Sequence, residues 1–185
     1  MLSAISARFV FPTVSMEGEA FWIVLAAPVK IKNFLWIKFF LYYIPLIILA
    51  EILIVASNYL LNVSSFMMIL SIITTFFLVP AVVALATGLG AIYADFKSEN
   101  PANTVTSFGG LLFMIVSFAL IAAVVILEAG PVYQIFMAAL HGYRLSLLQK
   151  IWTALSFGLA FSLCLIAIFY PIRLGEKHLI VKSRV

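Results

Sequence analysis

The sequence predicts an all-α polytopic membrane protein with four transmembrane helices, and three observations support this fold class. First, 65% of the 185 residues are hydrophobic and only 10% are charged, whereas a soluble domain is about half apolar and about one quarter charged. Second, four apolar stretches reach the roughly 20 residues that a helix needs to cross the hydrocarbon core of a bilayer. Third, the lysine and arginine residues lie mainly on one side of these stretches.

The predicted spans cover residues 34–58, 66–91, 107–127 and 152–170. The segment 60–65 between the first two spans is short and uncharged, so these spans should form a tight hairpin. The predicted domains are a cytoplasmic or interfacial segment (1–33), a four-span transmembrane domain (34–170) and a basic cytoplasmic tail (171–185).

The distribution of basic residues predicts the orientation of the bundle. Nine of the eleven precede the first span or lie near its start, lie between spans two and three, or occupy the tail. The other two, Arg144 and Lys150, follow span three. The positive-inside rule then places both termini in the cytoplasm and predicts a multi-pass protein of the plasma membrane, in a prokaryote the cytoplasmic membrane. We therefore expect the lipid bilayer as a partner and no nucleic acid.

The segment before the first span contains a predicted helix over residues 15–29. Its first residue is a serine that can cap the helix, and Glu17 and Glu19 lie in the first turn, where the helix dipole favours acids. The apolar run 20–27 is too short to span, and Pro28 ends the helix. Two interpretations fit: a helix that rests on lipid headgroups, which the residues alone favour, or one that docks on a partner.

The loop before the last span contains a second short apolar stretch, residues 132–140, directly after Gly130 and Pro131. This stretch is too short to cross the membrane. It predicts a re-entrant or interfacial helix on the outer face, with an ordinary amphipathic surface helix as the alternative.

Glu51 is the acidic residue inside the first predicted span. A carboxylate at that depth is costly and is usually functional or paired. Tyr43, Glu51 and Asn58 recur at helical spacing and share one face. This polar stripe can line a translocation path or bind another helix, and the alternative is a protonated Glu51 that is hydrogen-bonded to a neighbour.

Small residues at every fourth position predict sites of close helix packing in lipid. Two such series occur, one in the second span and one in the fourth. They are Ala86, Gly90 and Ala94, and Ala154, Gly158 and Ser162.

The sequence offers no constellation for catalysis. It contains no GxxxxGK[ST] phosphate loop, and no paired acids, Ser–His pair or His–Glu metal group falls at one predicted depth. Cys164 is the only cysteine and lies in an apolar run, so a cysteine metal site within the chain is excluded. We therefore expect neither an enzyme nor a metal site.

Two blocks of residues carry a resemblance to a known family. The first block comprises Ser15, Glu17, Gly18, Phe21-Trp22, Leu25, Ala27-Pro28 and Lys38. The second comprises Gly88-Leu89-Gly90, Asp95-Phe96-Lys97 and Glu99-Asn100-Pro101-Ala102. In their order and spacing the two blocks resemble the type-2 ATP-binding-cassette (ABC) permeases, and the second block is similar to a subgroup of ABC exporters.

The resemblance implies the permease component of an ABC exporter, which forms part of a translocation path driven by a separate ATP-binding subunit. In that family the helix before the third span is a coupling helix that fits a groove on the ATPase, and here it would be residues 15–29. ATP would bind to the partner subunit, with no cofactor in this chain. A solvated loop is the alternative for residues 95–99. The implied ATPase contacts are Glu17, Glu19, Phe21, Trp22, Asp95, Lys97 and Glu99.

The sequence also departs from the permease pattern. Its four spans would equal spans three to six of the family, and residues 1–10 resemble the end of span two. The first two spans would then be missing, or a second permease chain would supply them. The alternative function is a small integral-membrane interaction or regulatory module, or a non-transporting permease fragment.

Overall fold

The computed structural model describes residues 1–26, 31–96, 101–141 and 146–182, and these residues form helices and turns without any strand. Four helices are long and six are short. The short ones are α1 (Leu2–Ile5), η1 (Ser6–Val10), η2 (Phe11–Thr13), η3 (Ser15–Ala20), α2 (Phe21–Ala26) and α5 (Pro101–Thr106). The long ones are α3 (Ile31–Leu60), α4 (Ser65–Ile92), α6 (Phe108–His141) and α7 (Leu147–Lys182).

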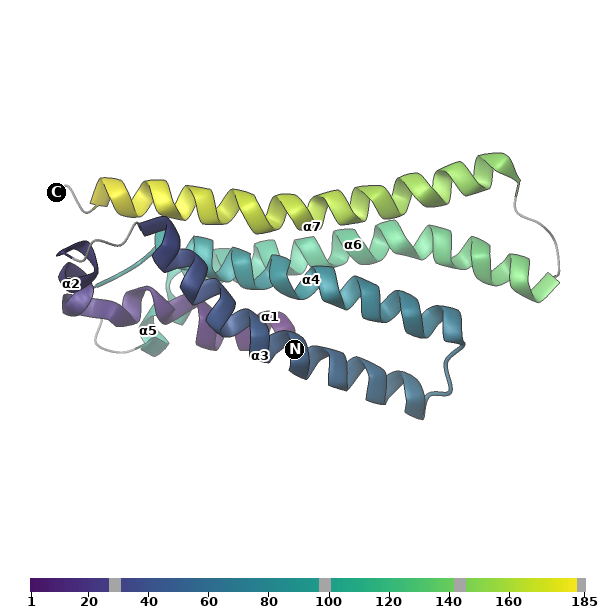
Figure 1. Ribbon diagram of the computed structural model, residues 1–185, viewed down its shortest axis with the longest axis horizontal. Coiled ribbons are helices and arrows are strands. Elements are labelled where there is room, and N and C mark those ends of the chain that lie inside the picture. Colours follow the sequence, from purple (N-terminus) through teal and green to yellow (C-terminus); the bar gives the residue numbers. More distant parts are fainter. Residues whose placement is uncertain (27–30, 97–100, 142–145, 183–185) are drawn as a thin grey trace.

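The four long helices lie side by side along the longest axis of the molecule (Figure 1). Each is long and apolar enough to cross a membrane, with a mean hydropathy of its most apolar stretch between 2.1 and 2.9. The all-α fold class and the four candidate spans are thereby confirmed. All four helices extend beyond the apolar stretches that predicted them, and the extension is largest for α6 and α7.

Helix α4 forms the centre of the bundle. Residues 78–88 are all buried, and the helix makes its most extensive contacts with α7 and α3. Gly88 explains the close approach to α7, because an added Cβ would lie 2.4 Å from the carbonyl carbon of Pro171. Small residues at a helix crossing let two backbones approach, which is the main way that helices gain packing energy in lipid.

Except for α1, which lies beside Met1 near the middle, the short helices extend toward one end of the bundle (Figure 1). We define the short-helix cluster as residues 11–26, 93–96 and 101–106, and the hairpin end as the opposite end, where the α3–α4 turn (61–64) lies. The last described residues of α7 lie at the end of the cluster, whereas Met1 lies midway along the bundle. From there the chain runs toward the cluster, and Phe11 stacks on Phe113 of α6 with ring centroids 5.9 Å apart.

The helix expected over residues 15–29 is not continuous. A 3-10 helix, η3, precedes α2, and Gly18 inside η3 breaks the helical path with φ 50° and ψ −133°. Glycine adopts this conformation readily because it has no Cβ, and any other residue would be strained there. Residues 27–30, including Pro28, lie outside the described part of the chain.

The separate outer helix expected after Gly130 is replaced by an unbroken α6 that continues through Pro131 to His141. Proline has no N–H, so it leaves the carbonyl of Leu127, four residues earlier, without its helical partner. The hydroxyl of Ser156 on α7 donates a hydrogen bond to that carbonyl at 2.7 Å. A contact from another helix thus compensates for the proline. Arg144 and residues 142–145 lie outside the described residues.

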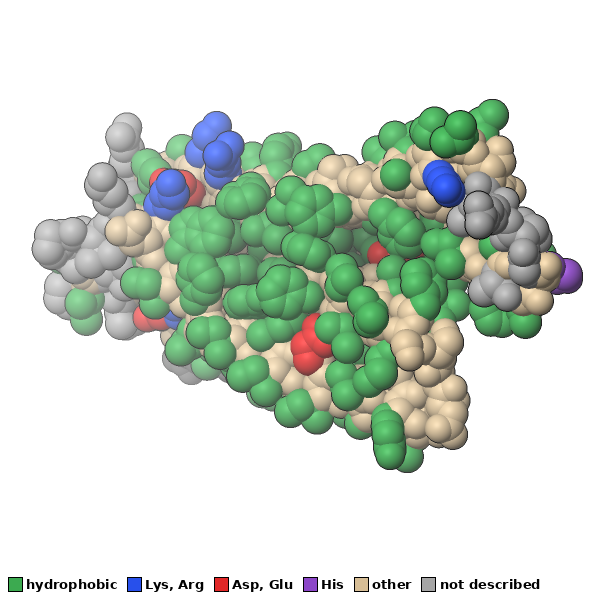
Figure 2. Space-filling model, turned by 45° about the vertical axis from the view of Figure 1, so that its right-hand side comes forward, with side chains coloured by type: hydrophobic (Ala, Val, Ile, Leu, Met, Phe, Trp, Pro, Cys, Tyr) green, Lys and Arg blue, Asp and Glu red, His purple; other side chains and the backbone are tan. Residues whose placement is uncertain are grey.

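Large apolar side chains cover most of the surface along the middle of the molecule, and basic side chains appear toward its ends (Figure 2). Ile37, Ile52, Ile115, Phe118 and Ile126 are each more than 60% exposed. Surface of this kind is typical of helices that contact lipid, where apolar side chains need no protein cover. The surface and the four long apolar helices are those of a membrane protein.

Candidate functional site

The short-helix cluster is attached to the start of α3 by Lys38. Its ammonium group donates to the carbonyl oxygen of Thr13 at 2.9 Å and forms an ion pair with Glu17. It also lies 5.2 Å from the ring centre of Phe34. Both charged side chains are mostly shielded from solvent, with 17% of Lys38 and 30% of Glu17 exposed. One lysine thus ties η2 and η3 to a long helix.

A second set of contacts lies within the cluster and joins η3 and α2 to residues 95 and 96, which follow α4. The hydroxyl of Ser15 accepts a hydrogen bond from the backbone N–H of Asp95 at 3.1 Å. Phe21 stacks on Phe96 with ring centroids 4.5 Å apart and meets Phe34 of α3 edge-on at 6.1 Å. Ser15, expected to cap its own helix, makes no such cap and instead holds the chain after α4.

The outer side of the cluster presents two exposed apolar side chains. Met16 is 61% exposed and Ile23 is 54% exposed, and Asp95, whose N–H bonds to Ser15, is also exposed. Among the predicted contacts, Glu17 and Phe21 face inward to Lys38 and Phe96. The side chains of Glu19 and Trp22 are not described, and Lys97 and Glu99 lie outside the described residues.

The polar stripe on α3 is half-buried along its length. Asn58 donates to the hydroxyl of Ser71 on α4 at 2.5 Å, so this member of the stripe joins two helices. Tyr43 stacks on Phe39 of the same helix, with ring centroids 5.5 Å apart. Glu51 has a buried carboxylate oxygen with no hydrogen-bond partner among the described residues.

The two series of small residues have different surroundings. Ala86, Gly90 and Ala94 are buried, and an added Cβ on Gly90 would lie 2.3 Å from the carbonyl oxygen of Phe11. In contrast, a Cβ added to Gly158 would meet nothing within 4 Å. The other members of that series are Ala154, which is exposed, and Ser162, which bonds to Leu159 in its own helix.

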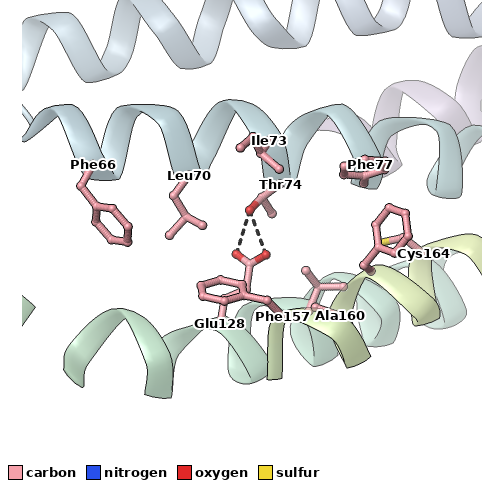
Figure 3. Close-up of a pocket in the computed structure, with 11 residues that line it drawn as sticks. Phe66, Leu70, Ile73, Thr74, Phe77, Glu128, Phe157, Ala160 and Cys164 are labelled. Carbon is pink, nitrogen blue, oxygen red and sulfur yellow. Dashed lines mark hydrogen bonds between the residues drawn. The ribbon is translucent and has the colours of Figure 1, made fainter. Parts of the chain in front are cut away.

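A pocket between α4, α6 and α7 was missed by the sequence analysis. It has a volume of about 290 Å³ and a single acidic side chain in its wall, Glu128 of α6. The hydroxyl of Thr74 on α4 lies 2.8 and 2.9 Å from the two carboxylate oxygens (Figure 3). Glu128 directly follows the predicted end of span three, so it was expected at the outer interface and not between three helices.

Periodicity could have found the apolar wall of this pocket. On α4 the lining residues recur at intervals of three and four, which places them on one helical face, and the same holds on α7. The lining residues are Phe66, Leu70, Ile73, Thr74 and Phe77 of α4, Val124 and Glu128 of α6, and Phe157, Ala160, Phe161 and Cys164 of α7. No hydropathy pattern indicates that the three faces meet, because almost every face of these helices is apolar.

Cys164 is a free, buried thiol in the pocket wall, and no group of three metal-ligating side chains occurs within the described ranges. The site therefore offers apolar contact, aromatic rings and one carboxylate. Such a set can bind and orient a molecule, and it lacks the paired acid and base of a hydrolytic centre.

These features define the class of the protein as polytopic, all-helical and membrane-embedded. The sequence model of a family described as "Putative ATP-binding cassette" matches residues 1–181, and the chain therefore belongs to this family. No curated protein and no solved structure matched the chain.

The family match corrects one interpretation of the sequence. Its description names an ATP-binding cassette, which indicates an ATP-binding component rather than a permease, so the assignment to exporter permeases and the translocation function that it implied are wrong. The first block behind that assignment is, in sequence, a short apolar run between acids and a proline. Interfacial segments of many membrane proteins share this pattern, so it does not discriminate between families. The relation to ABC systems and the membrane association remain.

Proposed function

We propose that this chain is a membrane-embedded helical component of an ABC system, and that the short-helix cluster binds a separate ATP-binding subunit. The family match supports the ABC context, and four apolar helices of spanning length support a place in the membrane. ATP would bind to the partner, because the sequence has no GxxxxGK[ST] phosphate loop and its described residues form a helical bundle.

The contacts of Lys38 with Thr13 and Glu17 are the main support for this proposal, because they connect the short-helix cluster to a candidate span. A partner that pulls or pushes on η3 and α2 acts through the Glu17–Lys38 ion pair on α3, and through the Ser15–Asp95 hydrogen bond on the end of α4. The cluster is thus attached to two candidate spans. Chains of packed side chains and hydrogen bonds between rigid elements can carry such coupling between sites.

The orientation of the chain belongs to the same proposal. Lys38 near the start of α3, and Arg173, Lys177 and Lys182 near the end of α7, place positive charge at the end of the bundle that holds the cluster. The positive-inside rule assigns this end to the cytoplasmic side of the plasma membrane, where ATP is available to a partner.

The structure also guides the choice of residues for a test. Reversing the charge of Glu17 would break its ion pair with Lys38, so any loss of partner binding would have two explanations. Met16 and Ile23 point outward, and changing them leaves the inner contacts intact. Leu148, which is 80% exposed near the hairpin end, provides a matched apolar control.

The test is co-purification in mild detergent from the native host, followed by identification of bound proteins. We expect a protein with a phosphate loop and ATPase activity to co-purify with the wild-type chain. The Met16→Ser/Ile23→Ser variant should retain several-fold less of this ATPase. In the wild-type chain the exposed half of each apolar side chain would be buried against the partner, and the serines lose that contact. Leu148→Ser should retain the wild-type amount. Equal retention by all three chains, or the absence of such an ATPase, would contradict the proposal.

A further inference from the structure

The pocket between α4, α6 and α7 has the composition of a binding site for a small organic cation with an apolar body. Its volume of about 290 Å³ lies at the lower end of small-molecule sites, and its wall is apolar except for Thr74, Glu128 and the thiol of Cys164. Four phenylalanine rings contribute to that wall: Phe66, Phe77, Phe157 and Phe161.

Glu128 lies deep in the bundle. Thr74 is about 14 Å along α4 from its first residue, and Glu128 is about 20 Å from the last residue of α6, at a rise of 1.5 Å per residue. An acidic side chain at such a depth is normally paired with a cation or with several donors.

The hydrogen bonding of Glu128 is incomplete. A carboxylate has room for about four hydrogen bonds, and the hydroxyl of Thr74 supplies one hydrogen that the two oxygens share. No lysine, arginine or histidine is among the residues that line the pocket. In Figure 3 the carboxylate points across the cavity toward Thr74, with its oxygens on the pocket side. The site thus presents an acceptor without a basic partner.

The geometry points to a binding site for a free monocationic amine with an apolar, preferably aromatic, body. The ammonium group donates its hydrogens to Glu128 and supplies the missing positive charge. The body fills the space between the phenylalanine rings, whose faces also attract a cation. A hydrated metal ion would find one carboxylate and no further charged ligand, so the apolar wall favours an organic cation. This inference is independent of the partner proposed for the short-helix cluster.

The test compares 4-phenylbutylamine with 4-phenylbutanol, which has the same skeleton and no charge. Binding is measured by calorimetric titration of the purified full chain in phosphatidylcholine nanodiscs. We expect the amine to bind and the alcohol to bind about tenfold more weakly or worse, because a hydrogen bond to a charged group adds that much affinity. Equal binding of both would show an apolar cavity without charge recognition and would overturn the inference.

Variants locate the binding. Glu128→Gln keeps an oxygen that accepts from Thr74 and removes the charge, so it should lose the preference for the amine. Ala160→Leu fills the cavity and should weaken both probes. Glu51→Gln, which removes the carboxylate on α3 that does not line this pocket, should bind the amine as the wild type does. Thermal denaturation of each variant verifies the fold, and loss of amine binding in Glu51→Gln alone would place the site elsewhere.

A further measurement distinguishes a free amine from the ammonium group of a lipid headgroup as the occupant of the pocket. Nanodiscs that contain phosphatidylethanolamine offer the same ammonium group on a lipid headgroup. A free-amine site should bind 4-phenylbutylamine with unchanged affinity in these discs, because the phenylalanine rings of the pocket wall favour an aromatic body that the lipid headgroup lacks. Loss of binding there would identify the lipid as the occupant and would overturn the assignment to a free amine.

Discussion

At the scale of single residues, Gly90 and Gly158 show how one sequence pattern can lie in opposite environments. Both are the central member of a small-residue series with a spacing of four. Gly90 packs so closely on the chain at Phe11 that a Cβ has no space, whereas Gly158 faces open space on α7. The spacing alone predicts that another segment of the chain can pack closely on the small residues. Whether a segment does so, and which one, depends on the whole fold.

Substitution by alanine should separate these two glycines. Gly90→Ala places a Cβ 2.3 Å from a backbone oxygen, and backbone must shift to relieve it, so we expect a loss of about 1–3 kcal/mol in stability. Gly158→Ala meets no atom and gains helix propensity, so it should be neutral or up to about 1 kcal/mol more stable. Thermal denaturation in one detergent measures both, and equal destabilisation of the two variants would contradict this packing.

The ion pair between Glu17 and Lys38 was only partly predictable from the sequence. Glu17 and Lys38 were both expected near the cytoplasmic interface, and the acid was attributed to a favourable helix dipole. Glu17 pairs with Lys38 of α3, and Gly18, which follows Glu17 directly, has a non-helical conformation. A glycine at this position signals a break, yet the direction of the bend follows from contacts that are distant in sequence, such as Phe21 with Phe96.

At the scale of elements, each long helix contains a proline: Pro45, Pro80, Pro131 and Pro171. Hydropathy predicted the existence of the four spans because apolar length is a local property. The predicted third span ended at residue 127, before Pro131, because a proline normally marks a helix boundary, whereas α6 continues to His141. The hydrogen bond from Ser156 to Leu127 allows α6 to continue, and no local pattern records that contact.

A double-mutant cycle tests this compensation. Ser156→Ala should cost about 1–3 kcal/mol, because it leaves the buried carbonyl of Leu127 without a donor. Pro131→Ala restores the helical N–H at that carbonyl. In the Pro131→Ala background the same serine substitution should therefore cost clearly less. Stability measured by urea or thermal denaturation gives the four values, and an equal cost in both backgrounds would exclude the compensation.

At the scale of the whole molecule, one end of the bundle differs from the other. The short-helix cluster, the start of α3 and the end of α7 share one end, and the α3–α4 turn lies at the opposite end (Figure 1). The composition predicted a membrane bundle well, because this much apolar surface requires lipid. It could not predict the Glu128 pocket, because apolar helices match one another on many faces and only the assembled bundle selects which faces meet.

Cysteine labelling tests the orientation that the charge distribution predicts. Cys164 is buried and is the only cysteine, so Cys164→Ser gives a background for single reporters. Ser64→Cys lies in the exposed α3–α4 turn, and Lys177→Cys lies on the exposed face of α7 near the cluster. A membrane-impermeant maleimide should label the residue-64 reporter in intact cells and both reporters after permeabilisation. The reverse order in intact cells would place the short-helix cluster outside, away from cytoplasmic ATP, and would contradict both the orientation and the proposed contact with an ATP-binding subunit.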